Sequence, residues 1–91
     1  MWTDGITKRA LKQIDRLPGR VRETLAVLIR EIEADGPFRG NWPNFSALTS
    51  GRYHCHLRKG RPTYVAIWEV RDISIRFIEV SYAGTHEKAP Y

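Results

Sequence analysis

Residues 52–82 read RYHCHLRKGRPTYVAIWEVRDISIRFIEVSY, and their pattern predicts three consecutive β-strands. The first strand covers residues 53–58, where apolar and polar side chains alternate. Such a period of two is typical of a strand with one buried face. The polar face carries His54, His56 and Arg58. We therefore expect two imidazoles and a guanidinium on a solvent-exposed face of a sheet.

Two predicted turns divide this stretch into strands. Residues 59–62 (Lys-Gly-Arg-Pro) form the first turn, because Gly tolerates positive φ and Pro cannot donate into a sheet ladder. Residues 63–70 are almost entirely β-branched, aromatic or aliphatic, which indicates a central strand buried on both faces. Arg71-Asp72 is the second predicted turn, and residues 73–82 form the third strand. The prediction is an antiparallel meander.

Two amphipathic helices precede the meander. Thr7 can cap a helix from Lys8 to about Leu17, Pro18-Gly19 ends it, and a second helix follows over residues 20–34. Apolar positions expected to face the sheet are Leu11, Ile14, Leu17, Val21, Leu25, Leu28, Ile29 and Ile32. Charged positions of the second helix expected to stay outside are Arg30, Glu31, Glu33 and Asp35. The predicted fold is α+β, with an N-terminal helical hairpin packed on one face of a small antiparallel sheet.

The remaining segments are short. Residues 1–6 are a candidate edge strand, and Gly36-Pro37 opens a loop that ends near Gly51. We expect three apolar side chains to hold this loop on the core: Trp42, Phe45 and Leu48. A tail, residues 83–91, follows the meander, and Gly84 at a turn and the aromatic Tyr91 favour its docking on the domain.

Composition limits the class of protein. A chain of 91 residues with 42% hydrophobic and 27% charged residues is typical of one soluble domain, residues 1–91. It contains no apolar run of the roughly 18 residues that a membrane span needs, and no secretory signal, so we expect a cytoplasmic protein. The net charge of +5 favours an anionic partner: a nucleic acid, an acidic protein or a membrane surface. The single cysteine, Cys55, excludes an internal disulfide.

The three histidines are the candidates for acid–base chemistry. His54 and His56 should project from one face roughly 7 Å apart, and His86 can reach the same surface if the tail folds back. Candidate phosphate ligands are Arg58, Lys59, Arg61, Arg76 and Lys88. This inventory suits RNA cleavage, because RNA carries its own nucleophile and the protein needs only a base, an acid and cations.

Each of these features has an alternative interpretation. The histidines could be solvated polar residues or, together with His86, zinc ligands. Cys55 lies between them and should point into the core as a small hydrophobe rather than act as a nucleophile. Four cations of the first helix could form a solvated face or guide a polyanion: Lys8, Arg9, Lys12 and Arg16.

The chain resembles the RelE/ParE superfamily of bacterial toxins, in particular its RelE- and HigB-like branch. The likeness is carried by three segments: YHCHLR (53–58), YVAIWEV (64–70) and GTHE (84–87). The resemblance implies a curved sheet under a helical hairpin. It also implies a metal-independent, cofactor-free endoribonuclease that cleaves mRNA, usually on the ribosome, and inhibits translation, together with an antitoxin partner.

The resemblance also implies residue roles. His54 and His56 match strand positions where relatives often place lysine or arginine to act on the 2′-hydroxyl and the phosphate. His86 matches the position after the last strand's glycine, where a proton donor or phosphate ligand sits. Tyr91 stands in for the family's C-terminal tyrosine. The expected antitoxin is acidic and lays an amphipathic helix across the basic surface.

Two departures from the family pattern keep other functions open. Residues 64–70 contain no match for the family's central-strand arginine, and the C-terminal helix of some members is absent. One alternative is a ParE-like toxin that inhibits DNA gyrase through protein contacts. The other is a basic RNA- or protein-binding module that has lost its activity.

Overall fold

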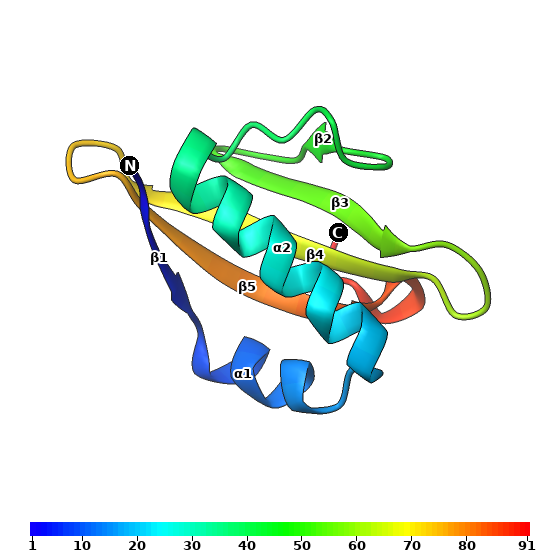
Figure 1. Ribbon diagram of the computed structural model, residues 1–91. Coiled ribbons are helices and arrows are strands. Elements are labelled where there is room, and N and C mark those ends of the chain that lie inside the picture. The colour runs from blue at the N-terminus through cyan, green and yellow to red at the C-terminus, as the bar shows by residue number, and fades with distance from the viewer.

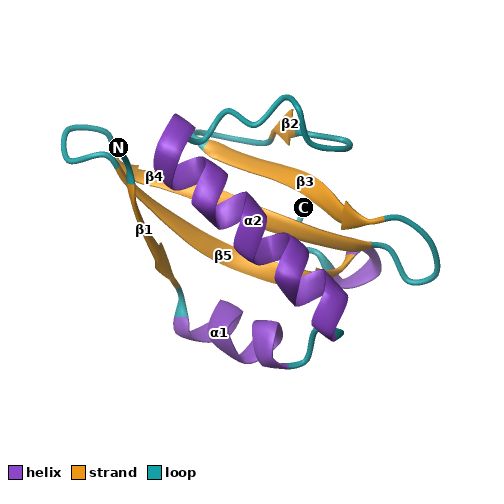
Figure 2. Ribbon diagram, viewed as in Figure 1, coloured by secondary structure: helices purple, strands orange, loops and turns teal.

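The computed structural model describes residues 1–91 and has the predicted order of two helices followed by a meander. Its elements are β1 (Thr3–Ile6), α1 (Lys8–Asp15), α2 (Gly19–Asp35), β2 (Ser46–Ala47), β3 (Arg52–Arg58), β4 (Tyr64–Asp72), β5 (Phe77–Thr85) and the 3₁₀ helix η1 (His86–Lys88). In Figures 1 and 2, α2 crosses one face of the sheet and α1 lies beside β5. None of these helices is long and apolar enough to cross a membrane.

The sheet has five strands in the order β1-β5-β4-β3-β2, with β4 at its centre as predicted. β3, β4 and β5 form the antiparallel meander, and β2 pairs with β3 in the same sense. β1 is an edge strand, and it pairs in parallel with β5. The α+β prediction is therefore confirmed, with a mixed sheet in place of a purely antiparallel one.

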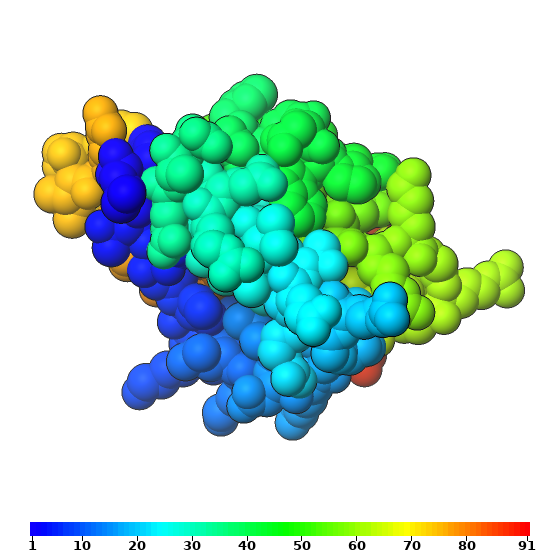
Figure 3. Space-filling view, viewed as in Figure 1, coloured from blue at the N-terminus to red at the C-terminus, as the bar shows by residue number.

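One face of the sheet is sealed by the helices, and we call it the helix face. Four apolar side chains of α2, three or four residues apart, are at most 2% exposed: Val21, Leu25, Leu28 and Ile32. They pack in one cluster with Cys55, Ala66, Trp68 and other inward side chains of the strands. Figure 3 views this side of the molecule, where the two helices hide most of the sheet. Burial of a continuous apolar stripe is what holds such a helix on a sheet.

The opposite face, which we call the tail face, has a different composition. Its side chains come from alternate positions of the meander: His54, His56, Val65, Ile67 and Tyr82. Register places His54 beside Ile67, and Ile67 beside Tyr82. In Figure 1 the C-terminus lies behind the sheet, because the tail crosses this face.

Helix α1 is shorter than predicted and rotated slightly. It ends at Asp15, before Leu17, and its N-cap is Thr7 as expected, because the Thr7 hydroxyl accepts a hydrogen bond from Ala10 N (3.0 Å). Ala10 is fully buried, whereas Leu11 is 50% exposed, so the prediction for Leu11 was wrong. An alanine can approach β5 more closely than a leucine, and the helix presents that side to the strand.

The second turn of the meander was also misplaced. β4 continues through Asp72, and the turn covers residues 73–76. The Asp72 carboxylate accepts hydrogen bonds from Ser74 N (3.0 Å) and Ile75 N (3.3 Å), a local arrangement typical of aspartate in turns. Ile73 is consequently 71% exposed. The residues at 73–77 alternate as in a strand, but the hydrogen bonds to the Asp72 side chain and the positive φ of Arg76 make them a turn.

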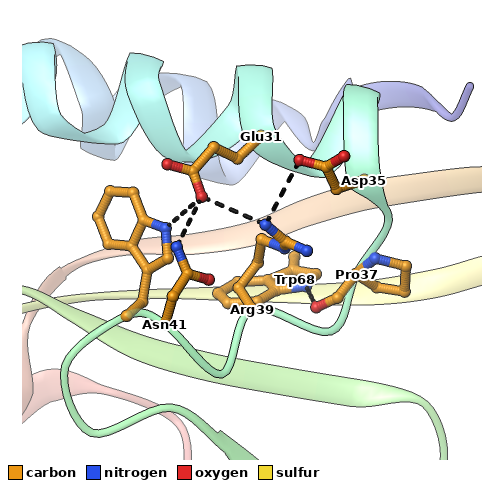
Figure 4. Close-up of polar contacts among 7 residues, drawn as sticks. Glu31, Asp35, Pro37, Arg39, Asn41 and Trp68 are labelled. Atoms are coloured by element: carbon orange, nitrogen blue, oxygen red, sulfur yellow. Dashed lines mark hydrogen bonds and ion pairs between the residues drawn. The ribbon is translucent and has the colours of Figure 1, made fainter.

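The loop between α2 and β3 is tied to the helix by a single carboxylate. Glu31 accepts hydrogen bonds from Trp42 Nε1 (2.9 Å), Asn41 Nδ2 (3.1 Å) and Arg39 Nη1 (3.3 Å), as Figure 4 shows. Glu31 is therefore half-buried, and Glu33 is half-buried beside Asp4, contrary to the prediction that both stay outside. The predicted apolar anchors do hold the loop, because Trp42 and Phe45 pack on the helix face and Leu48 on the tail face.

Candidate functional site

Four aromatic side chains form a closed ring on the tail face, and we call this group the histidine cluster: His54, His56, His86 and Tyr91. Ring centroids are 6.1 Å apart for His54 and His56, and 5.7 Å apart for His56 and His86. Tyr91 closes the ring, 5.8 Å from His86 and 4.7 Å from His54. Three histidines that lie up to 32 residues apart in the sequence therefore meet at one place.

Strand pairing and the tail place these side chains. His54 and His56 project from the same face of β3 because they are two residues apart. The tail turns at η1, directly after β5, where His86 N donates to Thr63 O (2.8 Å) and Ala89 N to His86 O (3.2 Å). Ala89 packs on the apolar side chains of the tail face, and this contact brings Tyr91 over β3.

His54 is held inside the cluster, contrary to the expectation of a solvent-exposed imidazole. It is 8% exposed, and its Nδ1 lies 2.9 Å from the hydroxyl of Ser46, its neighbour on β2. Burial lowers the pKa of His54, the Ser46 contact opposes this effect, and the charge of His86 adds to it. The prediction was wrong on exposure because the sequence does not show that Tyr91 covers this ring.

His56 is half-buried, and its Nδ1 is enclosed without a hydrogen-bond partner. Burial lowers the pKa of His56, and the charges of His54, His86 and Lys59 lower it further. The imidazole is thus neutral near pH 7, the form that accepts a proton. A buried polar atom left unpaired costs free energy, so this nitrogen lowers the stability of the fold.

The two tyrosines of this face differ in their surroundings. Tyr91 is 50% exposed, and burial of its remaining surface together with the nearby Tyr82 raises its pKa. Tyr82 is 7% exposed, and its hydroxyl donates to Thr85 O (2.8 Å). Sequence reasoning missed both Tyr82 and Ser46 as residues of this face. Tyr82 shares the strand period of the tail face, whereas Ser46 carries no sequence signal because its strand has only two residues.

The predicted phosphate ligands are not all close to the cluster. Lys59 is near enough for its charge to lower the pKa of His56, and Lys88 lies two residues after His86 in η1. Arg58 is exposed and follows a β-bulge in β3, and Arg61 is exposed in the next turn.

Arg76 lies elsewhere. It sits at the opposite end of β5, where its carbonyl accepts from Thr3 N (2.9 Å). The nine residues of β5, a length of about 30 Å, separate it from His86. The structure therefore does not bring Arg76 to the cluster; the turn that holds it belongs to the other end of the sheet.

Metal binding and thiol chemistry find no support in the arrangement of these residues. No group of three or more His, Cys, Asp or Glu side chains is arranged to hold a metal ion. Cys55 is fully buried on the helix face, and burial raises its pKa to about 12. The Cys55 thiol thus packs as the predicted small hydrophobe, on the opposite side of the sheet from the imidazoles.

Comparison of whole structures finds similar folds, although no protein-family model and no curated protein sequence matches the chain. The intact E. coli RelBE toxin–antitoxin complex contains a chain with a TM-score of 0.76 and 21% identity, covering 97% of this chain and 100% of that one. A mutant of the E. coli toxin RelE in the free state gives 0.74 and 22%, covering 97% and 86%. The archaeal RelE–RelB complex from Pyrococcus horikoshii OT3 gives 0.72 and 16%, covering 97% and 98%.

These matches span nearly the full length of both chains, at identities low enough that they speak for the fold alone. They share two helices packed on a five-stranded sheet. The likeness first seen in three short segments thus extends to the whole architecture, and this chain has the fold of the RelE toxins.

Proposed function

We propose that this chain is the toxin of a type II toxin–antitoxin system and a metal-independent endoribonuclease that cleaves mRNA, in association with the ribosome, and so inhibits translation. The observation that carries the proposal is the histidine cluster, three imidazoles and a tyrosine within 6.1 Å of their ring neighbours on the face that the helices leave free. The RelE fold supports the same conclusion.

The chemistry assigned to the cluster is transfer of the phosphoryl group to the neighbouring 2′-hydroxyl. His56, neutral because of its lowered pKa, takes the 2′-hydroxyl proton. The 2′-oxygen attacks the phosphorus, and the bond to the 5′-oxygen breaks. His86, exposed and 5.7 Å away, donates a proton to that leaving oxygen. The products are a 2′,3′-cyclic phosphate and a free 5′-hydroxyl, and the charge that builds on the phosphate is stabilised by Lys59 and Lys88.

His54 and Tyr91 have supporting roles in this proposal. His54 is too buried to reach RNA, and its contact with Ser46 fixes the ring on which Tyr91 rests. His54 is therefore a positioning residue. Tyr91 exposes half its surface at the rim of the cluster, where it can contact the phosphate or stack on a base.

An acidic antitoxin is the proposed protein partner. Three of the similar structures are toxin–antitoxin complexes. The net charge of +5 of this chain favours binding to an acidic partner. An amphipathic helix of that partner would cover the basic surface to which RNA binds.

The direct test is RNA cleavage by the purified chain, with free mRNA and with programmed ribosomes, in the presence of EDTA. We expect His86→Ala and His56→Gln each to slow cleavage by about 10²–10⁴-fold, the usual contribution of an acid or a base. The His86 side chain is exposed, so the His86→Ala variant should keep the fold. Lys8→Ala, an exposed change on α1 outside the cluster, is the control and should cleave like the unmodified chain.

The pH dependence of cleavage tests the identity of the base. Because the pKa of His56 is lowered from 6.5, the rate should rise through an apparent pKa below that value as pH increases. His56→Lys should move this rise to much higher pH, since an unperturbed lysine titrates at about 10.4.

Three results would contradict the proposal. Cleavage by His86→Ala at the full rate would remove His86 from the mechanism. Absence of cleavage by the unmodified chain on free and ribosomal mRNA would remove the nuclease. Stalled DNA supercoiling with intact RNA would favour the gyrase-inhibiting alternative.

A further inference from the structure

A second basic site lies beside the histidine cluster, in a cleft between α1 and the last residues of β5. The cleft has a volume of about 510 Å³. Its polar lining comes from three parts of the chain: Arg9 and Gln13 of α1 with Arg16 at the C-cap of this helix, Ser81 and Thr85 of β5, and Lys88 of η1. Ligand pockets of roughly 300–1,000 Å³ are common, so the space suits one nucleotide unit.

The cleft exists because β1 covers only half of β5. The pairing of β1 ends at Ile6 opposite Val80, and the outer edge of β5 is unpaired by any strand from Ser81 onward. Gln13 reaches across from α1, and its Oε1 accepts a hydrogen bond from Ala83 N (3.1 Å). This bond satisfies the exposed edge of the strand and leaves the Gln13 NH₂ group free to donate to a ligand.

The charge of the cleft has one sign. Arg9, Arg16 and Lys88 line it, none of them makes an ion pair, and no acidic side chain is part of the lining. In contrast, Arg39 and Arg71 are neutralised by neighbouring carboxylates. Unpaired cations beside hydroxyl and amide donors are the usual ligands of a phosphodiester.

The cleft and the histidine cluster adjoin each other at Tyr82 and η1. Tyr82 lines the cleft and also lies beside Tyr91, and Lys88 stands two residues after His86. Tyr64 and Leu17 add apolar surface on the inner side, against which a base can lie. An RNA strand that leaves the cluster past η1 therefore reaches the cleft directly, and Glu87 is the one acidic side chain of η1 on this path.

We propose that this cleft binds the phosphate of a nucleotide next to the cleaved bond, with Arg9, Arg16 and Lys88 as its cationic ligands. The inference rests on the proposed function in taking RNA as the ligand. It assigns α1 a part in substrate binding that the solvated-face interpretation of its cations does not give.

The test is binding of non-cleavable 2′-O-methyl RNA oligonucleotides, two to eight nucleotides long, measured by fluorescence anisotropy at several salt concentrations. Arg9→Gln/Arg16→Gln should weaken binding of the longer oligonucleotides by about tenfold or more and leave the dinucleotide unchanged. It should also make the slope of log K against log salt shallower by about 0.7, because the cleft holds one phosphate and each neutralised phosphate of a single strand contributes roughly that amount. The matched control, Arg20→Gln/Arg30→Gln, removes two exposed, unpaired charges from α2 outside the cleft, and its affinity should stay close to that of the unmodified chain.

Binding and cleavage separate the two proposals. If His86→Ala abolishes cleavage but both double variants bind RNA alike, the cleft proposal falls and the nuclease stands. If length-dependent binding requires Arg9 and Arg16 but nothing is cleaved, the nuclease falls and the cleft stands. If the Arg9/Arg16 variant binds RNA normally but no longer binds an acidic antitoxin, the cleft is a binding site for the protein partner, and the proposal is overturned.

Discussion

The two faces of the central strand differ in how completely their polar and apolar groups are satisfied. On the helix face, Ala66 and Trp68 are fully buried in the large apolar cluster, and the Trp68 Nε1 donates to Pro37 O (2.9 Å). On the tail face, Val65 and Ile67 are equally buried, but beside them His56 keeps an enclosed nitrogen without a partner.

This difference separates stability from function. On the helix side of the central strand the Trp68 Nε1 is paired, whereas on its tail side the enclosed Nδ1 of His56 has no partner, and an unpaired buried atom lowers stability. Val65, Ile67 and Tyr82 form an apolar surface on which Ala89 of the tail packs, and the imidazoles lie beside this surface. We therefore expect substitutions on the helix face to change the free energy of unfolding most, and those in the cluster to change cleavage.

The largest effect on stability is expected from Leu28→Ala on the helix face. Leu28 is 1% exposed in the large cluster. Truncating a buried leucine leaves a cavity and costs about 3 kcal/mol. Urea denaturation should show this loss as a lower midpoint with an unchanged slope. Cleavage per folded molecule should stay the same, because the cluster lies on the other side of the sheet.

Leu11→Ala is the matched control for that change. The Leu11 side chain is 50% exposed on α1, so its truncation should cost less than about 0.5 kcal/mol. Equal midpoints for the two variants would mean that the helix face does not carry the stability of the domain.

A smaller effect is expected from Gly84→Ala on the tail face. A Cβ at position 84 would lie 2.8 Å from the Tyr82 hydroxyl and 3.0 Å from its Cζ. The Tyr82 ring must move, and its hydrogen bond to Thr85 O breaks. We expect a cost of about 1–2 kcal/mol in urea denaturation. Gly40→Ala, where an added Cβ meets nothing within 4 Å, is the control. A Gly84→Ala chain as stable as the control would show that Tyr82 is not fixed against the strand.

Hydrophobic periodicity was sufficient to predict the helix face. The spacing of Val21, Leu25, Leu28 and Ile32 has one packing solution, against the apolar side of the meander, and it is the one observed. The sequence did not predict that β1 pairs in parallel with β5, because a strand of four residues carries no information on its direction. The second turn was misplaced because a local contact of Asp72, and not the apolar pattern, ends β4.

For the histidine cluster, the sequence predicted the four members but not their surroundings. The two-residue spacing of His54 and His56 fixed their common face. Placing His86 and Tyr91 beside them needed the course of the tail, which depends on a few contacts of η1 and Ala89. Burial of His54 and the cleft beside Arg9 arise from segments distant in sequence, and no local pattern encodes them.

The smallest predicted effect concerns a place where the helix face is imperfect. Asp4 of β1 lies against Glu33 of α2, and its Oδ2 is enclosed without a hydrogen-bond partner. Burial, followed by the hydrogen bond and the charge of Glu33, raises the pKa of Asp4 from 3.8 to about 6. A carboxyl with a raised pKa in the folded state favours folding while protonated and opposes it once charged. Stability should thus fall as pH rises from about 4 to about 6.

Asp4→Asn removes the charge and should abolish that fall. Asparagine resembles the protonated carboxyl, so both chains should unfold alike near pH 4, and the variant should be more stable by about 1 kcal/mol at pH 7, a value reduced for solvent screening. Glu33→Gln removes the same repulsion, so the double variant should gain less than the sum of the two. A stability difference that does not vary with pH would mean that the two carboxyls do not interact and that Asp4 does not titrate with a raised pKa.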